Sequence, residues 1–131
     1  MFVLDTNTVI YFFKGKGRVA EHLLATSPRE IALPAVVVYE LEVGTLKMEA
    51  ATKRRKQLDQ LVTATTVLPF GVEEARIGAQ IRLSLERAGM KIGPLDNLIA
   101  ATAMRHSAIL VTHNVDEFSR VEGLTISDWF V

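Results

Sequence analysis

A short apolar run near the start of the chain, Phe2-Val3-Leu4, ends abruptly on the polar residues Asp5-Thr6-Asn7. A continuously apolar run of this kind is typical of a parallel strand that is covered on both faces. Asp5 stands where such a strand would leave the sheet, which is where open α/β folds place their ligand-binding groups. Because Asp5 would equally suit the N-cap of a following helix, its role depends on what the rest of the chain brings to it.

The remainder of the sequence alternates between helical periodicity and short apolar runs. Strands are predicted near residues 31–33, 65–69, 108–111 and 123–126, and helices near 7–14, 18–25, 35–44, 47–64, 72–88, 95–105 and 115–118. Strands separated by helices predict an α/β fold with a central, mostly parallel sheet of four to five strands and helices on both faces. We expect one domain that spans residues 1–131, with its last strand at an edge of the sheet and Trp129 packing the C-terminus down.

Residues 35–44 carry two conflicting signals. Their β-branched side chains favour a strand by propensity. Pro34 suits a helix N-terminus, however, and Val37, Leu41 and Gly44 share one face at helical spacing. We predict a helix that forms a hairpin with the helix predicted at 47–64.

Composition excludes several classes of protein. The chain of 131 residues has no cysteine, which rules out disulfides and thiolate metal sites and makes a reducing cytoplasm its natural setting. No window is apolar for long enough to span a membrane. Lys plus Arg and Asp plus Glu each total 15, so the chain lacks the net positive charge that a non-specific nucleic-acid binder usually carries.

Acidic and amide residues stand at the ends of several predicted elements. They are Asp5 after the first strand, Glu40 within an apolar helix, Asp96 in a first helical turn, and Asn114 and Asp116 after the fourth strand. Each has a structural explanation when taken alone, as a helix cap or as a favourable charge at a helix N-terminus. In a parallel sheet, however, groups at strand ends and helix starts can meet at one edge.

Glu40 is the hardest of these to explain by structure alone. It lies between Tyr39 and Leu41 in a segment that we predict to be buried, whereas Glu42 is expected to face solvent. A buried carboxylate needs a counter-charge or a proton. Two carboxylates roughly 4 Å apart would repel by about 4 kcal/mol at an effective dielectric constant near 20. A cluster of them therefore predicts bound Mg²⁺ or Mn²⁺, which would polarise a phosphoryl oxygen and activate water.

Four stretches in this order resemble the PIN-domain ribonucleases and, more closely, the VapC toxins of VapBC toxin–antitoxin modules. They are Leu4-Asp5-Thr6-Asn7, the segment 39–44 (YELEVG), the segment 93–101 (GPLDNLIAA) and the segment 111–118 (VTHNVDEF). The resemblance extends from Met1 to about Trp129. Each motif alone is weakly specific, and the four in this order across a small domain are strongly so.

The resemblance implies a toxin that acts as an Mg²⁺- or Mn²⁺-dependent endoribonuclease, cuts RNA such as tRNA, and so blocks translation. It also implies neutralisation by a VapB-type antitoxin and a homodimer. By this resemblance Asp5 and Asp96 would bind metal directly, and Glu40 would bind it or orient the attacking water.

The resemblance also assigns supporting positions and shows one departure. Thr6, Asn7 and Thr112 match supporting polar residues of the family. Many relatives carry a fourth Asp where this chain has Asn114. Asn114 would offer a neutral oxygen or hold a water, and Asp116 would substitute if its loop bends inward. The sequence therefore leaves open whether the site binds one metal ion or two.

Basic residues near the site are candidates for RNA contact. Lys14 and Lys16, just after the first predicted helix, are better placed to bind the RNA backbone than the run Lys53-Arg54-Arg55-Lys56, which is typical of a solvated helix face. His113 adjoins the predicted site and has two interpretations, a phosphate contact or an exposed turn histidine.

Two rival functions are consistent with parts of the same pattern. One is a phosphotransfer enzyme with Asp5 as its nucleophile, although Asp5-Thr6-Asn7 lacks a second Asp two residues on. The other is a catalytically inactive PIN-fold module that only binds a partner, against which the three retained acids argue. The first helix, with Ile10, Phe12 and Phe13, either contributes to a partner interface or fills the core.

Overall fold

The computed structural model describes residues 1–131 and contains one five-stranded sheet. Its strands are β1 (Phe2–Leu4), β2 (Ile31–Pro34), β3 (Thr66–Leu68), β4 (Ile109–Val111) and β5 (Thr125–Ser127). They are arranged in the order β3-β2-β1-β4-β5, and every neighbouring pair is parallel. The prediction of a parallel α/β sheet is confirmed, and so is the edge position of the last strand.

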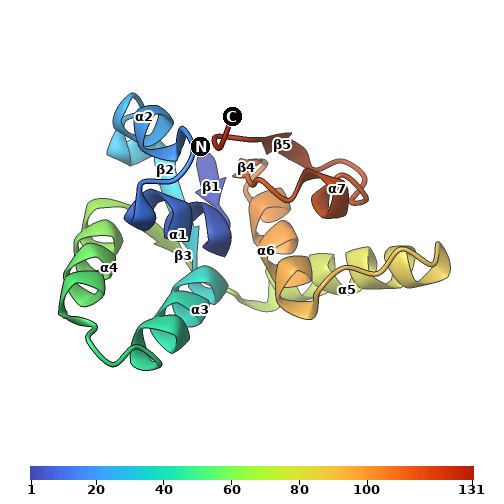
Figure 1. Ribbon diagram of the computed structural model, residues 1–131. Coiled ribbons are helices and arrows are strands. Elements are labelled where there is room, and N and C mark those ends of the chain that lie inside the picture. Colours follow the sequence, from blue (N-terminus) through green and yellow to red (C-terminus); the bar gives the residue numbers. More distant parts are fainter.

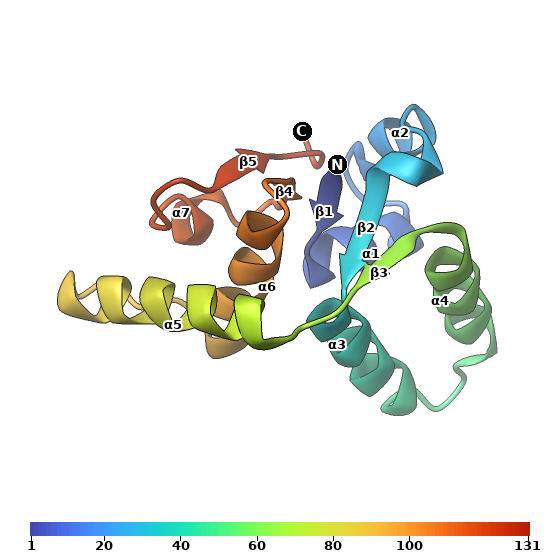
Figure 2. The same ribbon diagram turned by 180° about the vertical axis from the view of Figure 1, so that it is seen from behind.

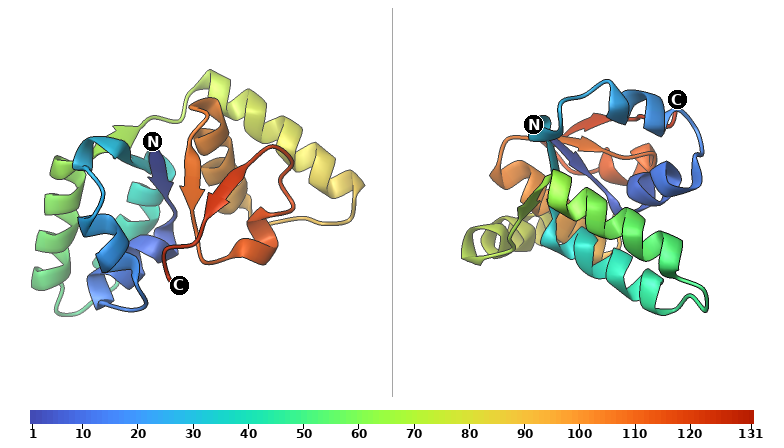
Figure 3. Two further views of the ribbon diagram at one scale, coloured as in Figure 1. Left: turned by 90° about the horizontal axis from the view of Figure 1, so that it is seen from above. Right: turned by 90° about the vertical axis from the view of Figure 1, so that its left-hand side faces the viewer.

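Helices cover both faces of this sheet. They are α1 (Thr6–Lys14), α2 (Val19–Leu24), α3 (Ala35–Leu46), α4 (Thr52–Ala64), α5 (Val72–Arg87), α6 (Pro94–Arg105) and α7 (Val115–Phe118). Helices α1 and α2 lie on one face and α5 and α6 on the other, as the views from the front, the back and the side agree (Figures 1, 2 and 3). None of these helices combines the length and apolarity that a membrane span requires.

The segment with conflicting signals is helical, as predicted. Helix α3 begins directly after Pro34 and buries Val37, Leu41 and Thr45. The Thr45 hydroxyl donates to the Leu41 carbonyl oxygen at 2.8 Å, so the helix continues past Gly44 to Leu46. Helix α4 consequently begins at Thr52, later than the predicted 47. Tertiary packing of the Val37 and Leu41 face outweighs the strand propensity of the β-branched residues.

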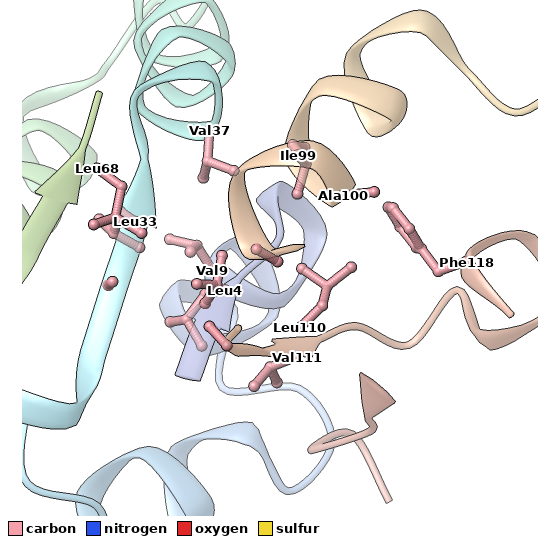
Figure 4. Packing of buried hydrophobic residues seen from close by; sticks show 14 of the residues in the cluster. Leu4, Val9, Leu33, Val37, Leu68, Ile99, Ala100, Leu110, Val111 and Phe118 are labelled. Carbon is pink, nitrogen blue, oxygen red and sulfur yellow. The ribbon is translucent and has the colours of Figure 1, made fainter. Parts of the chain in front are cut away.

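The core lies between the sheet and its helices. It contains Val3, Leu4, Leu33, Leu110 and Val111, none of which is exposed at all, and Figure 4 shows the strand residues meeting side chains from α3, α6 and α7. In the first helix Phe13 is buried, and Ile10 and Phe12 pack against the same core, which favours the core interpretation of that face.

The C-terminus packs down through Trp129, as predicted. Trp129 is buried, and its ring lies 5.2 Å from that of Phe2 at the start of β1. The tail that follows it reaches α1, since the ring of Phe130 lies 4.9 Å from that of Tyr11.

The strand order creates a switch point between β1 and β4. From β1 the chain moves to β2 and β3 on one side, and β4 and β5 are added on the other. Ligands of open α/β sheets bind at such a point, beyond the carboxyl ends of the strands. Leu4 pairs with Val111 in register, so Asp5 and Thr112 emerge next to each other at this edge.

Candidate active site

Asp5 forms the floor of the site and caps α1 at the same time. Its Oδ1 accepts a hydrogen bond from the Thr8 backbone N–H at 2.8 Å, and its own N–H donates to the Val111 carbonyl oxygen at 3.1 Å. The Asp5 side chain is only 4% exposed. The N-cap role and the site role of Asp5 are therefore compatible, because the bond to the Thr8 backbone N–H uses only Oδ1.

Burial raises the pKa of Asp5 above its usual value. The hydroxyls of Thr112 and Thr8 and the Thr8 backbone N–H act in the opposite direction, and the negative charge of Glu40 adds a smaller upward contribution. Thr8 was not among the predicted site residues. Its hydroxyl donates to the Val111 carbonyl oxygen at 3.1 Å and so ties α1 to β4. The sequence signal for it is its position three residues after an N-capping Asp.

Glu40 projects from the second turn of α3 toward the start of α1. Its Oε1 accepts a hydrogen bond from the Thr6 hydroxyl at 2.6 Å. This bond ties Glu40 to the first residue of α1, directly after Asp5. Glu40 is half-buried, so the prediction of a fully buried carboxylate is too strong. Glu42 was expected to face solvent, and its side chain is 40% exposed, with Arg55 of α4 donating to both of its oxygens at 2.9 and 2.7 Å.

Asp96 lies in the first turn of α6, close enough to Asp5 at the carboxyl end of β1 for the two charges to interact. Its Oδ2 is 3.3 Å from the position that a side chain on Gly93 would occupy, so glycine there lets the carboxylate come close to the backbone. The pKa of Asp96 is raised from 3.8 to about 6, first by burial and then by the charges of Glu117, Asp5 and Glu40. Four carboxylates from four different elements therefore influence one another at this edge.

Glu117 of α7 is the acid that the sequence interpretation missed. Its Oε1 accepts from the Gly93 N–H at 2.7 Å, and its Oε2 accepts from the Asn114 side-chain amide at 2.6 Å. Among the charges that raise the pKa of Asp96, that of Glu117 has the largest effect. The available signal was its spacing in the short helix, since Asn114 and Glu117 at i and i+3 share a face and Asp116 does not.

The remaining residues of the fourth motif divide into two groups. Thr112 is buried, and its hydroxyl accepts from the Asn114 backbone N–H at 3.0 Å, so both belong to the edge. Asp116 is exposed, and its side chain makes no hydrogen bond or ion pair with the rest of the chain. The fourth position near Asp96 is therefore filled by Glu117 and not by Asp116.

The predicted RNA-contact residues follow α1 away from the acids. Asn7 is exposed in the first turn, and Lys14 and Lys16 are exposed at the far end of the helix. Nine helical residues span about 13 Å, so the lysines do not touch the acidic edge. His113 lies between Thr112 and Asn114 with its side chain directed toward Tyr11 and the C-terminal tail.

The donor set fits a hard divalent cation. The available groups are carboxylate oxygens, supported by hydroxyls and an amide, which are the ligands that Mg²⁺ and Mn²⁺ prefer. No three of the acidic and histidine side chains are arranged closely enough to enclose an ion by themselves. This suits Mg²⁺, which usually takes one or two protein carboxylates and completes its shell with water and substrate phosphate.

Comparison with known proteins gives the same family from sequence and from structure. The PIN domain family model matches residues 2–124. The tRNA(fMet)-specific endonuclease VapC of Shigella flexneri is 32% identical over 128 residues, covering 98% of this chain and 97% of the relative. A crystal structure of DNA-bound VapBC from Salmonella typhimurium superimposes with a TM-score of 0.90 at 31% identity, covering 98% of this chain and 97% of the other.

A second complex has the same fold over the whole chain. The crystal structure of VapBC2 from Rickettsia felis, bound to a DNA fragment from the promoter, superimposes with a TM-score of 0.90 at 28% identity and covers 98% of each chain. The acidic edge between β1 and β4 thus belongs to a fold that this chain shares with these two proteins over 98% of its length. The chain belongs to the PIN domain family, and within it to the VapC group of ribonucleases.

Proposed function

We propose that this protein is the toxin of a VapBC-type toxin–antitoxin pair and that it cleaves RNA in a reaction dependent on Mg²⁺ or Mn²⁺, thereby inhibiting translation. One observation carries the proposal. Asp96 lies near Asp5, Glu40 and Glu117 at the switch point of the sheet, and their charges together with burial raise its pKa to about 6. Such an arrangement is unfavourable without a cation and useful for holding one.

The chain's own residues have distinct roles in this reaction. Asp5 and Asp96 offer carboxylate oxygens to the ion, Asp5 from a position fixed by its cap bond to Thr8. Glu40, whose carboxylate accepts a hydrogen bond from Thr6, orients the attacking water or accepts a proton from it. When bound, the ion would supply Lewis-acid polarisation of a phosphoryl oxygen.

Glu117 and Asn114 hold the far wall of the pocket. Through Gly93 and Asn114, Glu117 connects the start of α6 to the loop after β4, which keeps Asp96 at a fixed distance from Asp5. Its charge also increases the attraction of the pocket for a cation. In this proposal Glu117 takes the place of the fourth acid that many relatives have at the position of Asn114.

The relatives point to the substrate class and the partner. Two VapC relatives that align over 98% of this chain are described as tRNA(fMet)-specific endonucleases, and the two superimposed structures are VapBC complexes. We therefore infer tRNA as the first substrate class to test and a VapB-type antitoxin as the partner. The rival phosphotransfer function is disfavoured because Asp5-Thr6-Asn7 lacks a second Asp two residues on.

The proposal is tested by incubating the purified protein with end-labelled initiator and elongator tRNAs. We expect discrete cleavage products with Mg²⁺ or Mn²⁺, none with a chelator, and none after addition of a cognate VapB-type antitoxin. RNA that stays intact with either ion would contradict the proposal, as would cleavage that continues in the presence of chelator.

A matched pair of substitutions in α7 tests the assignment of the fourth acid. Glu117→Gln keeps the size of the side chain but removes the charge beside Asp96, and we expect RNA cleavage to fall roughly 10- to 100-fold. Asp116→Asn removes the same charge one residue earlier, on the exposed side, and should leave cleavage within about twofold of the parent. Initial cleavage rates at saturating Mg²⁺ measure both. A larger loss of cleavage in Asp116→Asn than in Glu117→Gln would instead assign the role of the fourth acid to Asp116.

A further inference from the structure

A cluster of aromatic rings adjoins the acidic edge and is not used by the chemistry described above. The ring of His113 stacks on that of Phe130 with centroids 4.2 Å apart and an angle of 21° between the planes. Tyr11 of α1 meets Phe130 edge-on at 4.9 Å and His113 at 6.0 Å. His113 therefore has one face on Phe130, while its side chain remains 40% exposed.

The His113 ring is held in place by a single carboxylate. Asp128 Oδ2 is 2.9 Å from His113 Nδ1, and Asp128 Oδ1 accepts from the Phe130 backbone N–H at 3.0 Å. The same residue thus fixes both members of the stack. Phe130 is fixed further from behind, since a side chain on Gly17 would come within 2.6 Å of its ring and the Phe130 carbonyl oxygen accepts from the Arg18 N–H at 2.9 Å.

The position of the ring relative to the acidic edge follows from the chain itself. His113 is flanked by Thr112 and Asn114, which are bonded to each other at that edge. Its side chain points from there along α1 toward Tyr11. Asn7, Tyr11 and Lys14 lie on one face of α1, because their spacings of four and three residues match the helical period. This face leads from the acids, past the aromatic ring, to Lys14 at the last turn.

We propose that His113, stacked on Phe130 and fixed by Asp128, is a platform on which one base of the single-stranded RNA substrate stacks next to the scissile phosphate. The inference rests on the proposed ribonuclease function and specifies how the substrate is seated. Every base has a π-face, so an aromatic ring beside a basic track binds single-stranded RNA without requiring a particular sequence. The scissile phosphate would then lie at the acidic edge, and Lys14, at the last turn of α1, would contact the RNA backbone farther along the strand.

The arrangement favours stacking over a charge contact for this histidine. Nδ1 is occupied by Asp128, so the exposed part of the ring, 40% of the side chain, offers a ligand its π-surface and only one ring nitrogen, Nε2. A fixed ring loses little conformational entropy when a base stacks on it, which raises the affinity gained. If the role of His113 were purely structural, replacing this residue would change the stability of the protein without changing its affinity for RNA.

The test compares RNA affinities in the Asp96→Asn background, in which the RNA stays intact. The probe is a fluorescently labelled, unstructured single-stranded RNA of ten nucleotides, and its anisotropy measures the dissociation constant. We expect His113→Ala to weaken binding about tenfold, within the range found for removal of a stacking aromatic ring. His113→Phe, which keeps a ring but no nitrogen, should bind within about threefold of the parent.

Two controls separate stacking from other effects. His106→Ala removes another exposed histidine, at the end of α6 opposite to Asp96, and should leave the affinity unchanged. Lys14→Ala should lower the slope of log affinity against log salt concentration by about 0.7, as for one lost phosphate contact, whereas His113→Ala should lower the affinity without changing that slope. Melting temperatures of all variants show whether they remain folded.

The outcomes distinguish the two proposals. If the parent sequence cleaves RNA but His113→Ala binds the probe as well as His106→Ala does, the platform is wrong and the ribonuclease function stands. An equal loss in His113→Ala and His113→Phe would also overturn stacking, because it would assign the contact to the ring nitrogens. If the parent neither binds nor cleaves RNA, both proposals fail together.

Discussion

Asp96→Asn is expected to abolish RNA cleavage while making the metal-free protein more stable. The substitution keeps the shape of the side chain and removes a charge and a metal ligand, so we expect the cleavage rate to fall by roughly 1000-fold or more. The gain in stability has the same origin. The ionised Asp96 side chain lies among Asp5, Glu40 and Glu117 without a cation, and its folded-state pKa is raised to about 6 as a result.

The sign of the stability effect follows from proton linkage. Because the pKa of Asp96 is higher in the folded protein than the ordinary 3.8, the folded state binds more protons between pH 4 and pH 6, and stability falls as the pH rises through that window. Above it the full penalty is present. Since Asp96 is only half-buried, we discount the effect to about 1 kcal/mol, or roughly 2–5 °C in melting temperature.

Thermal unfolding in chelator at pH 7.5 and pH 4 measures this effect. Asp96→Asn should melt above the parent at pH 7.5, and the difference should largely vanish at pH 4, where both side chains are neutral. Asp116→Asn is the matched control, because it removes an exposed carboxylate outside the acidic edge and should change neither quantity. If Asp96→Asn melts below the parent at pH 7.5, the Asp96 carboxylate stabilises the fold. Repulsion among the acidic side chains would then not destabilise the metal-free protein.

The central strands β1, β2 and β4 were predictable because they are short, apolar and mostly buried, whereas the edge strands β3 and β5 are largely exposed or half-buried. Val3, Leu4, Leu110 and Val111 are fully buried between two layers of helices, which is typical of parallel strands. The helix at 35–46 was predictable from its spacing in spite of its β-branched residues. The start of α4 was not, since it depends on how far the buried Thr45 extends the preceding helix.

The site was predictable where residues follow strands and less so where they lie on short helices. Asp5, Asp96 and Thr112 occupy the edge because the strand and helix ends place them there. Glu117 was missed because α7 has four residues, so its three-residue spacing from Asn114 was the only signal and did not indicate which side of the helix faces the acids. The stack of His113 on Phe130 was equally hidden, since it joins residues that are distant in sequence through the return of the C-terminal tail.

A bound divalent metal ion is expected to stabilise the folded protein by neutralising the repulsion among the acidic side chains. This stabilisation should depend strongly on pH. At a free concentration of Mg²⁺ or Mn²⁺ about 100 times the dissociation constant, binding to the folded state alone contributes about 2.7 kcal/mol. Protons compete with the ion for Asp96, so apparent affinity should fall by up to about tenfold per pH unit below pH 6, where the folded-state carboxyl becomes protonated. Cleavage should fall over the same range.

Melting temperatures at pH 7.5 and pH 5, with and without Mn²⁺, test this prediction. We expect a clear upward shift at pH 7.5, a much smaller one at pH 5, and almost none at either pH for Asp96→Asn. Potassium chloride at matched ionic strength controls for screening, which would act on the exposed ion pairs as well as on the acidic edge. A shift that is equally large at both pH values, or that persists in Asp96→Asn, would place the ion elsewhere and would separate the acidic edge from the metal dependence of RNA cleavage.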